Sequence, residues 1–284
     1  MTQNKDRESL LLWYTADEPD GWEYTLNSTK RAYDTIRALD LYHPVSLVLN
    51  CKDFYYAEYS AGADIVFEDA YPIGINATYS YTWNVACNAT YGDCGCDDCA
   101  GTIQDVSDRL DGLASHQKAL GRKYKPLYAV PQGFSDPEYW PREPSQVEVW
   151  AMNGLALNHG AKSLQVWDYP TAASVVTAQG EYAKVVTVDP VRAFLVGASP
   201  TTVEVQEWPM LDITYWKVGN QTLVSFVNGY NSTISGLIGV DLPFDVSGIG
   251  AQLWGTMNWI VRAGNELKVK GPSAFEHSLL ILDN

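Results

Sequence analysis

The feature that most constrains the fold is an alternation of short apolar runs with amphipathic stretches over the first two thirds of the chain. The apolar runs are typical of buried strands, and the stretches between them show the spacing of amphipathic helices. Strands separated in this way are joined by right-handed crossovers into a parallel sheet. The predicted strands are residues 10–16, 44–50, 63–67, 126–130 and 163–167, and the predicted helices are residues 28–39, 54–60, 103–120 and 147–158.

From about Pro200 the pattern changes to runs rich in Val, Thr and Trp that are separated by turn residues. Pairs such as Gly219-Asn220 and Asn228-Gly229 favour tight turns between antiparallel strands. We therefore predict an α/β domain over residues 1–199 and a small antiparallel β-sandwich over residues 200–284. The predicted strands of the second domain are residues 203–206, 213–218, 222–227, 236–242, 251–254, 266–269 and 277–282.

The charge of the chain excludes some partners. The 34 acidic and 19 basic side chains give a formal net charge of −15, and no run of Lys or Arg offers a basic patch. Nucleic acid and anionic membrane surfaces repel such a protein. No apolar run reaches the ~18 residues that a membrane span requires. We therefore expect a folded protein with neither a nucleic acid nor a membrane as partner.

Two features favour secretion of the intact parent protein, although no signal peptide is recognisable after Met1. One is the presence of five Asn-X-Ser/Thr glycosylation acceptors. The other is a crowd of cysteines in a stretch rich in Asn, Gly and Asp, which is typical of an oxidised loop. The candidate glycosylation sites are Asn27, Asn76, Asn88, Asn220 and Asn231.

We predict disulfides for the crowded cysteines Cys87, Cys94, Cys96 and Cys99. The fifth, Cys51, would pair with one of them or with a cysteine outside this chain. Four thiolates can also close a zinc site, but such sites usually present two Cys-x2-Cys arms that are separated by a dozen or more residues. Here all four cysteines are close together, so we favour disulfides and predict no metal.

Five parallel strands cannot close an eight-stranded (β/α) barrel, yet acidic or aromatic residues follow three of them, as they do at a barrel's active-site rim. Two interpretations remain open. The chain forms an open α/β sheet, or it is the later part of a (β/α)8-type barrel whose first three units are missing. The missing units would then be a partner fragment, and the absent signal peptide would have the same explanation.

Several segments carry a family resemblance. The segment Leu12-Trp13-Tyr14-Thr15-Ala16-Asp17-Glu18-Pro19 resembles the fourth strand of the large clan of TIM-barrel glycoside hydrolases, in which the proton-donating Glu commonly lies in Asn-Glu-Pro, although Asp17 replaces the Asn here. The resemblance covers residues 10–170, and many such barrels carry a β-sandwich after the eighth strand. It implies a glycosidase with Glu18 as the acid. Further segments resemble less characterised barrels of this kind: His43-Pro44-Val45, Asp69-Ala70-Tyr71-Pro72, Gln132-Gly133-Phe134, Arg142-Glu143-Pro144 and His159-Gly160-Ala161-Lys162.

One departure from the family pattern concerns the nucleophile. The clan places a nucleophilic Glu at the end of strand seven, where this chain has Gln132. Glycosidic bond cleavage requires a carboxylic acid to protonate the leaving oxygen and a second carboxylate to attack carbon or activate water. The second carboxylate must therefore be another strand-end residue, among Asp69, Glu68 and Asp168. We predict Glu18 and Asp69 as the catalytic pair.

The predicted substrate is an oligosaccharide or polysaccharide, and no cofactor is expected. Nucleophile-elbow, P-loop and zinc-protease motifs are absent from the sequence, and its four histidines are scattered singly. A non-catalytic carbohydrate-binding protein on a degenerate barrel is the alternative, and the separation of the carboxyl groups would discriminate between the two. The predicted substrate-binding residues are Asp17, Tyr71, Gln132, Trp167 and Asp168.

Overall fold

The computed structural model describes residues 3–87, 95–261 and 264–284 of the chain. The chain divides into two compact units. Unit 1 comprises Met1–Arg142 and Ala161–Trp167, and unit 2 comprises Glu143–Gly160 and Asp168–Asn284. The prediction of two domains placed their border at residues 199 and 200, whereas these units interleave along the chain.

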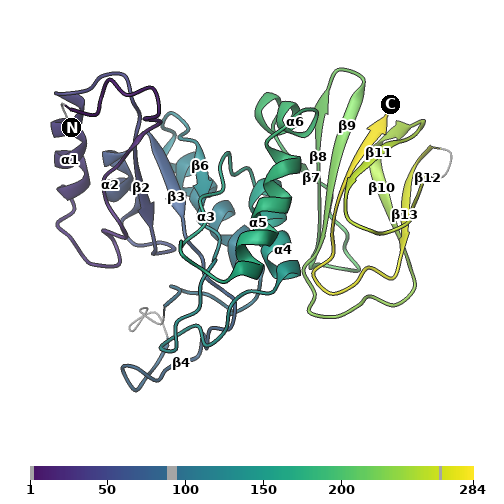
Figure 1. The fold of residues 1–284 in the computed structure, drawn as a ribbon, viewed down its shortest axis with the longest axis horizontal. Coiled ribbons are helices and arrows are strands. Elements are labelled where there is room, and N and C mark those ends of the chain that lie inside the picture. Colours follow the sequence, from purple (N-terminus) through teal and green to yellow (C-terminus); the bar gives the residue numbers. More distant parts are fainter. Residues whose placement is uncertain (1–2, 88–94, 262–263) are drawn as a thin grey trace. The chain divides into compact units, whose positions relative to one another are not determined.

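Unit 1 is built on a parallel sheet of four strands in the order β1-β2-β3-β6 (Figure 1). The strands alternate with helices along the chain, as the apolar pattern predicts. A two-stranded hairpin of β4 and β5 lies in the connection that follows β3. The elements are β1 (Trp13–Tyr14), α1 (Ser28–Arg37), β2 (Val45–Leu49), α2 (Tyr56–Tyr59), the short 3-10 helix η1 (Ser60–Gly62), β3 (Ile65–Glu68), β4 (Tyr79–Ser80), β5 (Val85–Ala86), α3 (Asp105–Leu120) and β6 (Leu127–Ala129).

The expected fifth parallel strand, residues 163–167, is not a full strand. It follows β6 only through two isolated parallel bridges, which pair Ala129 with Leu164 and Gln132 with Trp167. Pro131 lies between these bridges and has no N–H to donate, so the ladder of hydrogen bonds is interrupted there. The prediction of five parallel strands is therefore corrected to four, and the described residues show no closed barrel.

Strand β1 lies at an edge of the sheet, because β2 is its only strand partner among the described residues. Next to it, β2 is buried along its whole length. One face of the sheet gathers Val48, Phe67 and Val130 into a hydrophobic cluster with Tyr71. This cluster supports the carboxyl ends of the strands, where the candidate site lies.

Unit 2 packs three helices with an antiparallel β-sandwich. One sheet has the order β11-β14-β9-β8-β7 and the other the order β10-β13-β12. The predicted strands of this region are present except for residues 203–206, which form no strand. The elements are α4 (Gln146–Asn158), α5 (Ala173–Val186), α6 (Val191–Gly197), β7 (Thr201–Thr202), β8 (Leu211–Val218), β9 (Gln221–Asn228), β10 (Leu237–Val246), β11 (Gly248–Trp254), β12 (Trp259–Val261), β13 (Gly264–Lys270) and β14 (His277–Asp283).

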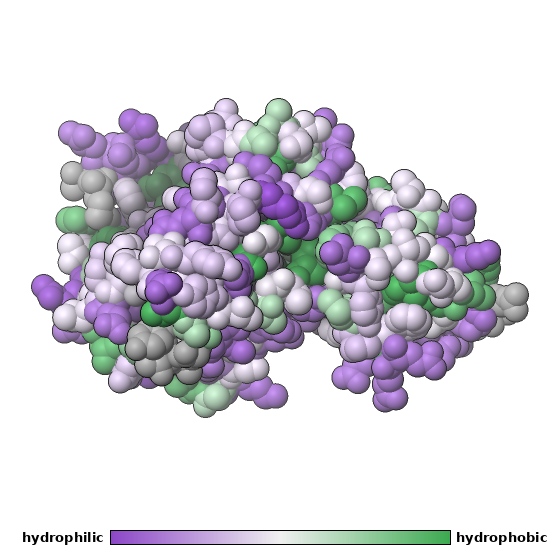
Figure 2. Space-filling model, turned by 90° about the horizontal axis from the view of Figure 1, so that it is seen from below, coloured by the Kyte–Doolittle hydropathy of each residue, from purple (hydrophilic) through white to green (hydrophobic). Residues whose placement is uncertain are grey.

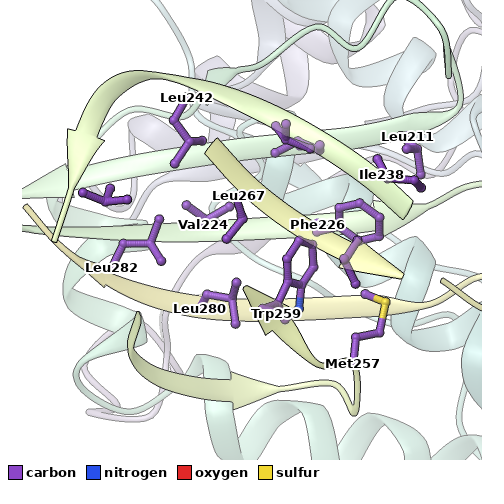
Figure 3. Close-up of a cluster of buried hydrophobic side chains, with 14 of the residues drawn as sticks. Leu211, Val224, Phe226, Ile238, Leu242, Met257, Trp259, Leu267, Leu280 and Leu282 are labelled. Atoms are coloured by element: carbon purple, nitrogen blue, oxygen red, sulfur yellow. The ribbon is translucent and has the colours of Figure 1, made fainter. Parts of the chain in front are cut away.

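The core of unit 2 lies between its two sheets. Side chains from both sheets, among them Phe226, Trp259 and Leu280, point toward one another there (Figure 3). Strand β9 is buried from Thr222 onward, because one of its faces meets this core and the other packs against α4. Unit 2 therefore has a hydrophobic core of its own.

Within the described parts of the chain, no helix is long and apolar enough to cross a membrane. One face of the molecule is covered mostly by hydrophilic and near-neutral residues, and hydrophobic residues appear there in small groups (Figure 2). Such a surface agrees with the strong acidic excess of the sequence.

Candidate active site

The loop after β1 positions Glu18. The buried carboxylate of Asp20 fixes this loop in place. It accepts hydrogen bonds from the backbone N–H groups of Gly21, Asn50 and Cys51 at 3.0, 3.2 and 2.9 Å. These bonds tie the loop to the end of β2. Glu18 itself has a φ of 44°, in the left-handed region that residues other than glycine rarely adopt. Such backbone strain is concentrated at functional sites.

Strand β3 positions Glu68 and Asp69, which are both buried. Asp69 has the strand parity of Ile65 and Phe67, while Glu68 has the opposite parity. The Glu68 carboxylate accepts the backbone N–H of Ala70 at 3.0 Å. Burial nevertheless raises the pKa of Glu68 to about 8. Glu68 is thus a buried acid directly beside Asp69.

Asp69 and Glu18 share a hydrogen bond between their side chains. Two carboxyl groups can make such a bond only if one of them holds a proton. Burial, followed by the negative charge of Glu18, raises the pKa of Asp69 well above its usual range. Its Oδ1 atom is buried and finds no hydrogen-bond partner among the residues that the structure describes. The pair is a proton-sharing dyad at the carboxyl ends of β1 and β3.

A buried guanidinium on α3 partly offsets this accumulation of acids. Arg109 donates hydrogen bonds to the backbone carbonyl oxygens of Asn50 and Asp97. Its positive charge lowers the pKa of both Asp69 and Glu68. The desolvation effect is larger, so the pKa values of both carboxyl groups remain raised.

Two tyrosine hydroxyls adjoin the dyad. Tyr14 donates its hydroxyl to Oδ1 of Asp17 at 2.5 Å, and burial together with this bond raises its pKa. Burial raises the pKa of Tyr71 as well, followed by the negative charges of Asp69 and Glu18. Both phenols therefore stay protonated and can donate hydrogen bonds. Asp17 is engaged by Tyr14 and remains exposed.

The ring of Tyr71 is packed and not open to solvent. It meets Phe134 and Trp140 edge to face, with ring centroids 5.1 and 5.9 Å apart, and Trp140 donates its indole N–H to the carbonyl oxygen of Tyr71 at 2.8 Å. Trp167, by contrast, is 48% exposed. Of the two aromatic residues predicted to bind substrate, Trp167 is therefore the accessible one.

Gln132 occupies a different role from the one predicted. Its Oε1 accepts the backbone N–H of Ile73 at 2.9 Å, and its Nε2 donates to the carbonyl oxygens of Ile73 and Phe134, both at 3.2 Å. The side chain has no exposed surface. Gln132 therefore holds the loop after β3 and has no free surface for a sugar. Asp168 belongs to unit 2, directly after Trp167 of unit 1, and its role in the site stays a prediction.

The cysteine predictions are met in part. Cys96 and Cys99 form a disulfide, and Cys87 is also disulfide-bonded. Cys94 and Asn88 lie outside the described residues. Cys51 is a free thiol, which corrects its predicted pairing within the cluster. Its backbone N–H is held by Asp20, in the loop of the dyad. Four of the glycosylation candidates are exposed: Asn27, Asn76, Asn220 and Asn231.

In the described segments, no group of three or more His, Cys, Asp or Glu side chains is arranged to hold a metal ion. A cavity of about 730 Å³ in unit 1 is lined by Leu10 and His43, among others, which precede β1 and β2. It therefore lies toward the amino ends of the strands, opposite the carboxyl ends that carry Glu18 and Asp69.

No protein-family model matches the chain, and no curated protein matches it either. Solved structures of similar fold are glycoside hydrolases. An Anoxybacillus α-amylase has 8% identity and a TM-score of 0.53, over 90% of this chain and 55% of that one. A debranching enzyme from Nostoc punctiforme has 13% identity and a TM-score of 0.50, over 97% of this chain and 58% of that one. A GH30 endoxylanase from Clostridium papyrosolvens has 9% identity and a TM-score of 0.51, over 96% of this chain and 66% of that one.

The chain thus spans less than two thirds of the length of these structures. At identities this low, the likeness concerns the fold alone. The fold is glycosidase-like, with a parallel sheet followed by antiparallel sheets, and a closed barrel is not shown.

Proposed function

We propose that the chain carries the catalytic carboxylates of a glycoside hydrolase, with Glu18 as general acid and Asp69 as nucleophile or base. The observation that supports this most is the proton-sharing pair at the carboxyl ends of β1 and β3. Glycosidic cleavage requires one protonated and one ionised carboxyl group at the same time. A dyad that holds a single proton is in that state before the substrate binds.

The raised pKa of Asp69 places the proton of the pair on Asp69 in the free protein, so the proposed roles require that proton to pass to Glu18 when the substrate binds. The roles themselves are assigned from position. Asp69 is buried at the end of a strand, so its carboxylate is fixed for attack on carbon or for activation of water. Glu18 lies on a loop and is only half-buried, so it can deliver its proton to a leaving oxygen and recover one from solvent. The reverse assignment predicts the opposite kinetic pattern and is separated by the experiment below.

Retaining glycosidases separate the two carboxyl groups by about 5 to 5.5 Å, and inverting enzymes by roughly 6.5 to 9.5 Å, so that the sugar lies between them. The proposal therefore requires the sugar to replace the direct interaction of Glu18 with Asp69 when it binds. The tyrosine hydroxyls of Tyr14 and Tyr71 would then be available to hydrogen-bond a sugar hydroxyl or the attacking carboxylate.

Kinetics with two kinds of substrate test the pair. Glu18→Gln should slow glycosides with poor leaving groups by ~10² to 10⁴, and activated aryl glycosides much less, because only the former require a proton. Asp69→Asn should slow both kinds. Glu23→Gln is the matched control, since Glu23 is an exposed carboxylate of the same loop. If Asp69→Asn shows the leaving-group pattern instead, the two roles are exchanged, and if neither variant changes turnover, the pair is not catalytic.

Carbohydrate binding without catalysis is the second candidate function, and two observations favour it. Gln132 occupies the place of the clan's nucleophile, and the dyad is closed. In that case Trp167→Ala should abolish glycan binding while the carboxylate variants leave it unchanged. Under either function we propose that the parent protein is secreted, which the Cys96–Cys99 disulfide and the exposed glycosylation acceptors support.

A further inference from the structure

Exposed aromatic side chains gather on the loops that follow the strands of the parallel sheet. Trp22 in the loop after β1 is 69% exposed, and Trp83 in the hairpin after β3 is 63% exposed. Their neighbours Tyr24, Tyr55 and Tyr81 are exposed as well. All of these loops leave the carboxyl ends of the strands, which is the edge that carries Glu18 and Asp69. Single exposed aromatics are common and also occur before the strands, but several on the loops of the edge that carries Glu18 and Asp69 suggest a binding surface.

The loops that carry these rings are held in place by specific contacts. The N–H of Trp22 donates to the carbonyl oxygen of Glu18 at 3.0 Å, so Trp22 lies one turn after the proposed acid. The hydroxyl of Tyr59 donates to the carbonyl oxygen of Tyr24 at 2.5 Å, which anchors the same loop. A ring on an anchored loop loses little freedom when it binds a ligand.

The hairpin that carries Trp83 is braced in the same way. The Tyr79 hydroxyl donates to Oδ1 of Asn84 at 2.6 Å, and the rings of Tyr79 and Tyr81 meet edge to face with their centroids 5.1 Å apart. Figure 1 shows the segment labelled β4 projecting on the lower side of the molecule, away from the helices α1 and α2.

The loops after β1 and β3 carry acidic but no basic side chains, which disfavours an anionic ligand. Residues 15–29 contain four carboxylates, Asp17, Glu18, Asp20 and Glu23, and no Lys or Arg. Residues 69–104 also contain Asp but no Lys or Arg. An anionic polymer would find no cation to pair with on either loop and would be repelled by the acidic excess. The surface therefore suits a ligand that has hydroxyl groups and apolar faces but no charge.

We propose that Trp22 and Trp83 are sugar-binding platforms that hold an uncharged polysaccharide across the carboxyl edge of the sheet. The inference rests on the proposed glycosidase function and extends it to the class of substrate. The C–H face of a sugar ring packs on an aromatic face, whose negative charge density favours it. Since β1 and β3 are separated by β2, their ends are about 10 Å apart, and a ligand that contacts both loops spans more than one sugar.

Affinity electrophoresis in gels that contain a soluble polysaccharide tests the platforms. The probes are amylopectin, mixed-linkage β-glucan and galactomannan as neutral polymers, with alginate as an anionic one. Trp22→Ala and Trp83→Ala should each weaken retardation by the neutral polymer that binds, by roughly three- to ten-fold per ring. Trp22→Phe should restore most of the affinity because it keeps a ring. Tyr42→Ala and Tyr124→Ala are matched controls, since both residues are exposed aromatics that precede a strand of the same sheet.

The outcomes are distinct. The proposal is overturned if no neutral polymer retards the wild-type protein, if alginate does so equally well, or if the control variants weaken binding as much as the tryptophan variants. If a neutral polymer retards the protein but no small aryl glycoside is turned over, the platforms are supported and the proposed catalysis is wrong. If an aryl glycoside is turned over but no neutral polymer retards the protein, the catalysis is supported and the platforms are wrong.

Discussion

Glu68 is a buried acid that is expected to make stability depend on pH. Its pKa is about 8 in the folded protein against an ordinary value of 4.5, so folded molecules retain a proton that unfolded ones release between these values. Its stabilising contribution is therefore complete below about pH 4.5 and is lost as the pH rises through about 8. We expect the free energy of unfolding to fall over this range.

Urea denaturation at several pH values measures this effect. Asp69 acts in the same direction because its pKa is raised too, so the wild-type slope combines both residues. Glu68→Gln keeps the shape and cannot ionise, and it should flatten the dependence between pH 5 and 8. An identical slope in the variant would show that Glu68 does not titrate in this range.

The sequence indicates which side chains of the candidate site lie close together in some cases and not in others. The proximity of Glu18 and Asp69 could be predicted because both follow strands of one parallel sheet, whose carboxyl ends lie at a common edge. Gln132 could not, because the carbonyl and N–H groups that occupy its amide belong to Ile73, which is distant in the sequence. The free state of Cys51 depends likewise on where the loop after β2 lies, which no local pattern indicates.

At the scale of elements, β14 contains an acid-sensitive residue. His277 is buried, and burial lowers its pKa to about 3 from 6.5. Unfolded chains take up a proton below pH 6.5 while the folded sandwich does not, so stability from this group is complete above about 6.5 and is lost as the pH falls toward 3. His277→Gln can keep a hydrogen bond to Ser225, and thermal unfolding of the variant should depend less on pH between 7 and 5. Equal losses in both proteins would contradict this.

The contact of α1 with η1 depends on a glycine. A Cβ on Gly62 would lie 2.2 Å from the backbone carbon of Thr29 in α1, and backbone atoms cannot yield as a flexible side chain does. Gly62→Ala should therefore push α1 outward and destabilise the protein by about 1 to 3 kcal/mol. Gly112→Ala in α3 is the control, because its Cβ meets nothing within 4 Å and alanine favours a helix by about 0.5 to 1 kcal/mol. Chemical denaturation should show changes of opposite sign.

The elements that the sequence predicts least well are α5 and α6 of unit 2, for which no helix is predicted, whereas α4 is predicted almost to its ends. Residues Ala173–Val186 form α5 although they are rich in Val, which is stiff in helices, and contain Gly180. Packing against α4 overrides these local preferences, since the buried residues Val175, Ala178 and Tyr182 recur at helical spacing. That spacing is a sequence signal for α5. It is weak, because Pro170 and Pro190 flank the segment and proline is typical of loops. The strands were easier to predict because their alternation and turns are local.

At the scale of the whole molecule, each unit has its own hydrophobic core, so we expect unfolding in two stages. Scanning calorimetry should resolve two transitions, since separate cores need not melt together. Gly62→Ala should lower only the transition of unit 1. Phe226→Ala removes a large side chain from the core in Figure 3 and should lower only the transition temperature of unit 2. The expected loss in the free energy of unfolding of that unit is roughly 3 to 5 kcal/mol. A single transition that both variants shift equally would show one cooperative fold.

The interleaving of the two units also sets an order of events on the ribosome. Helix α4 of unit 2 is synthesised before residues Ala161–Trp167, which belong to unit 1. Its buried face, which includes Met152 and Leu155, packs against β9, which is synthesised later. Nascent chains fold from the amino end as they appear. A nascent chain in which α4 still lacks its β9 partner is therefore a stage of biosynthesis at which a chaperone could bind the apolar face of α4.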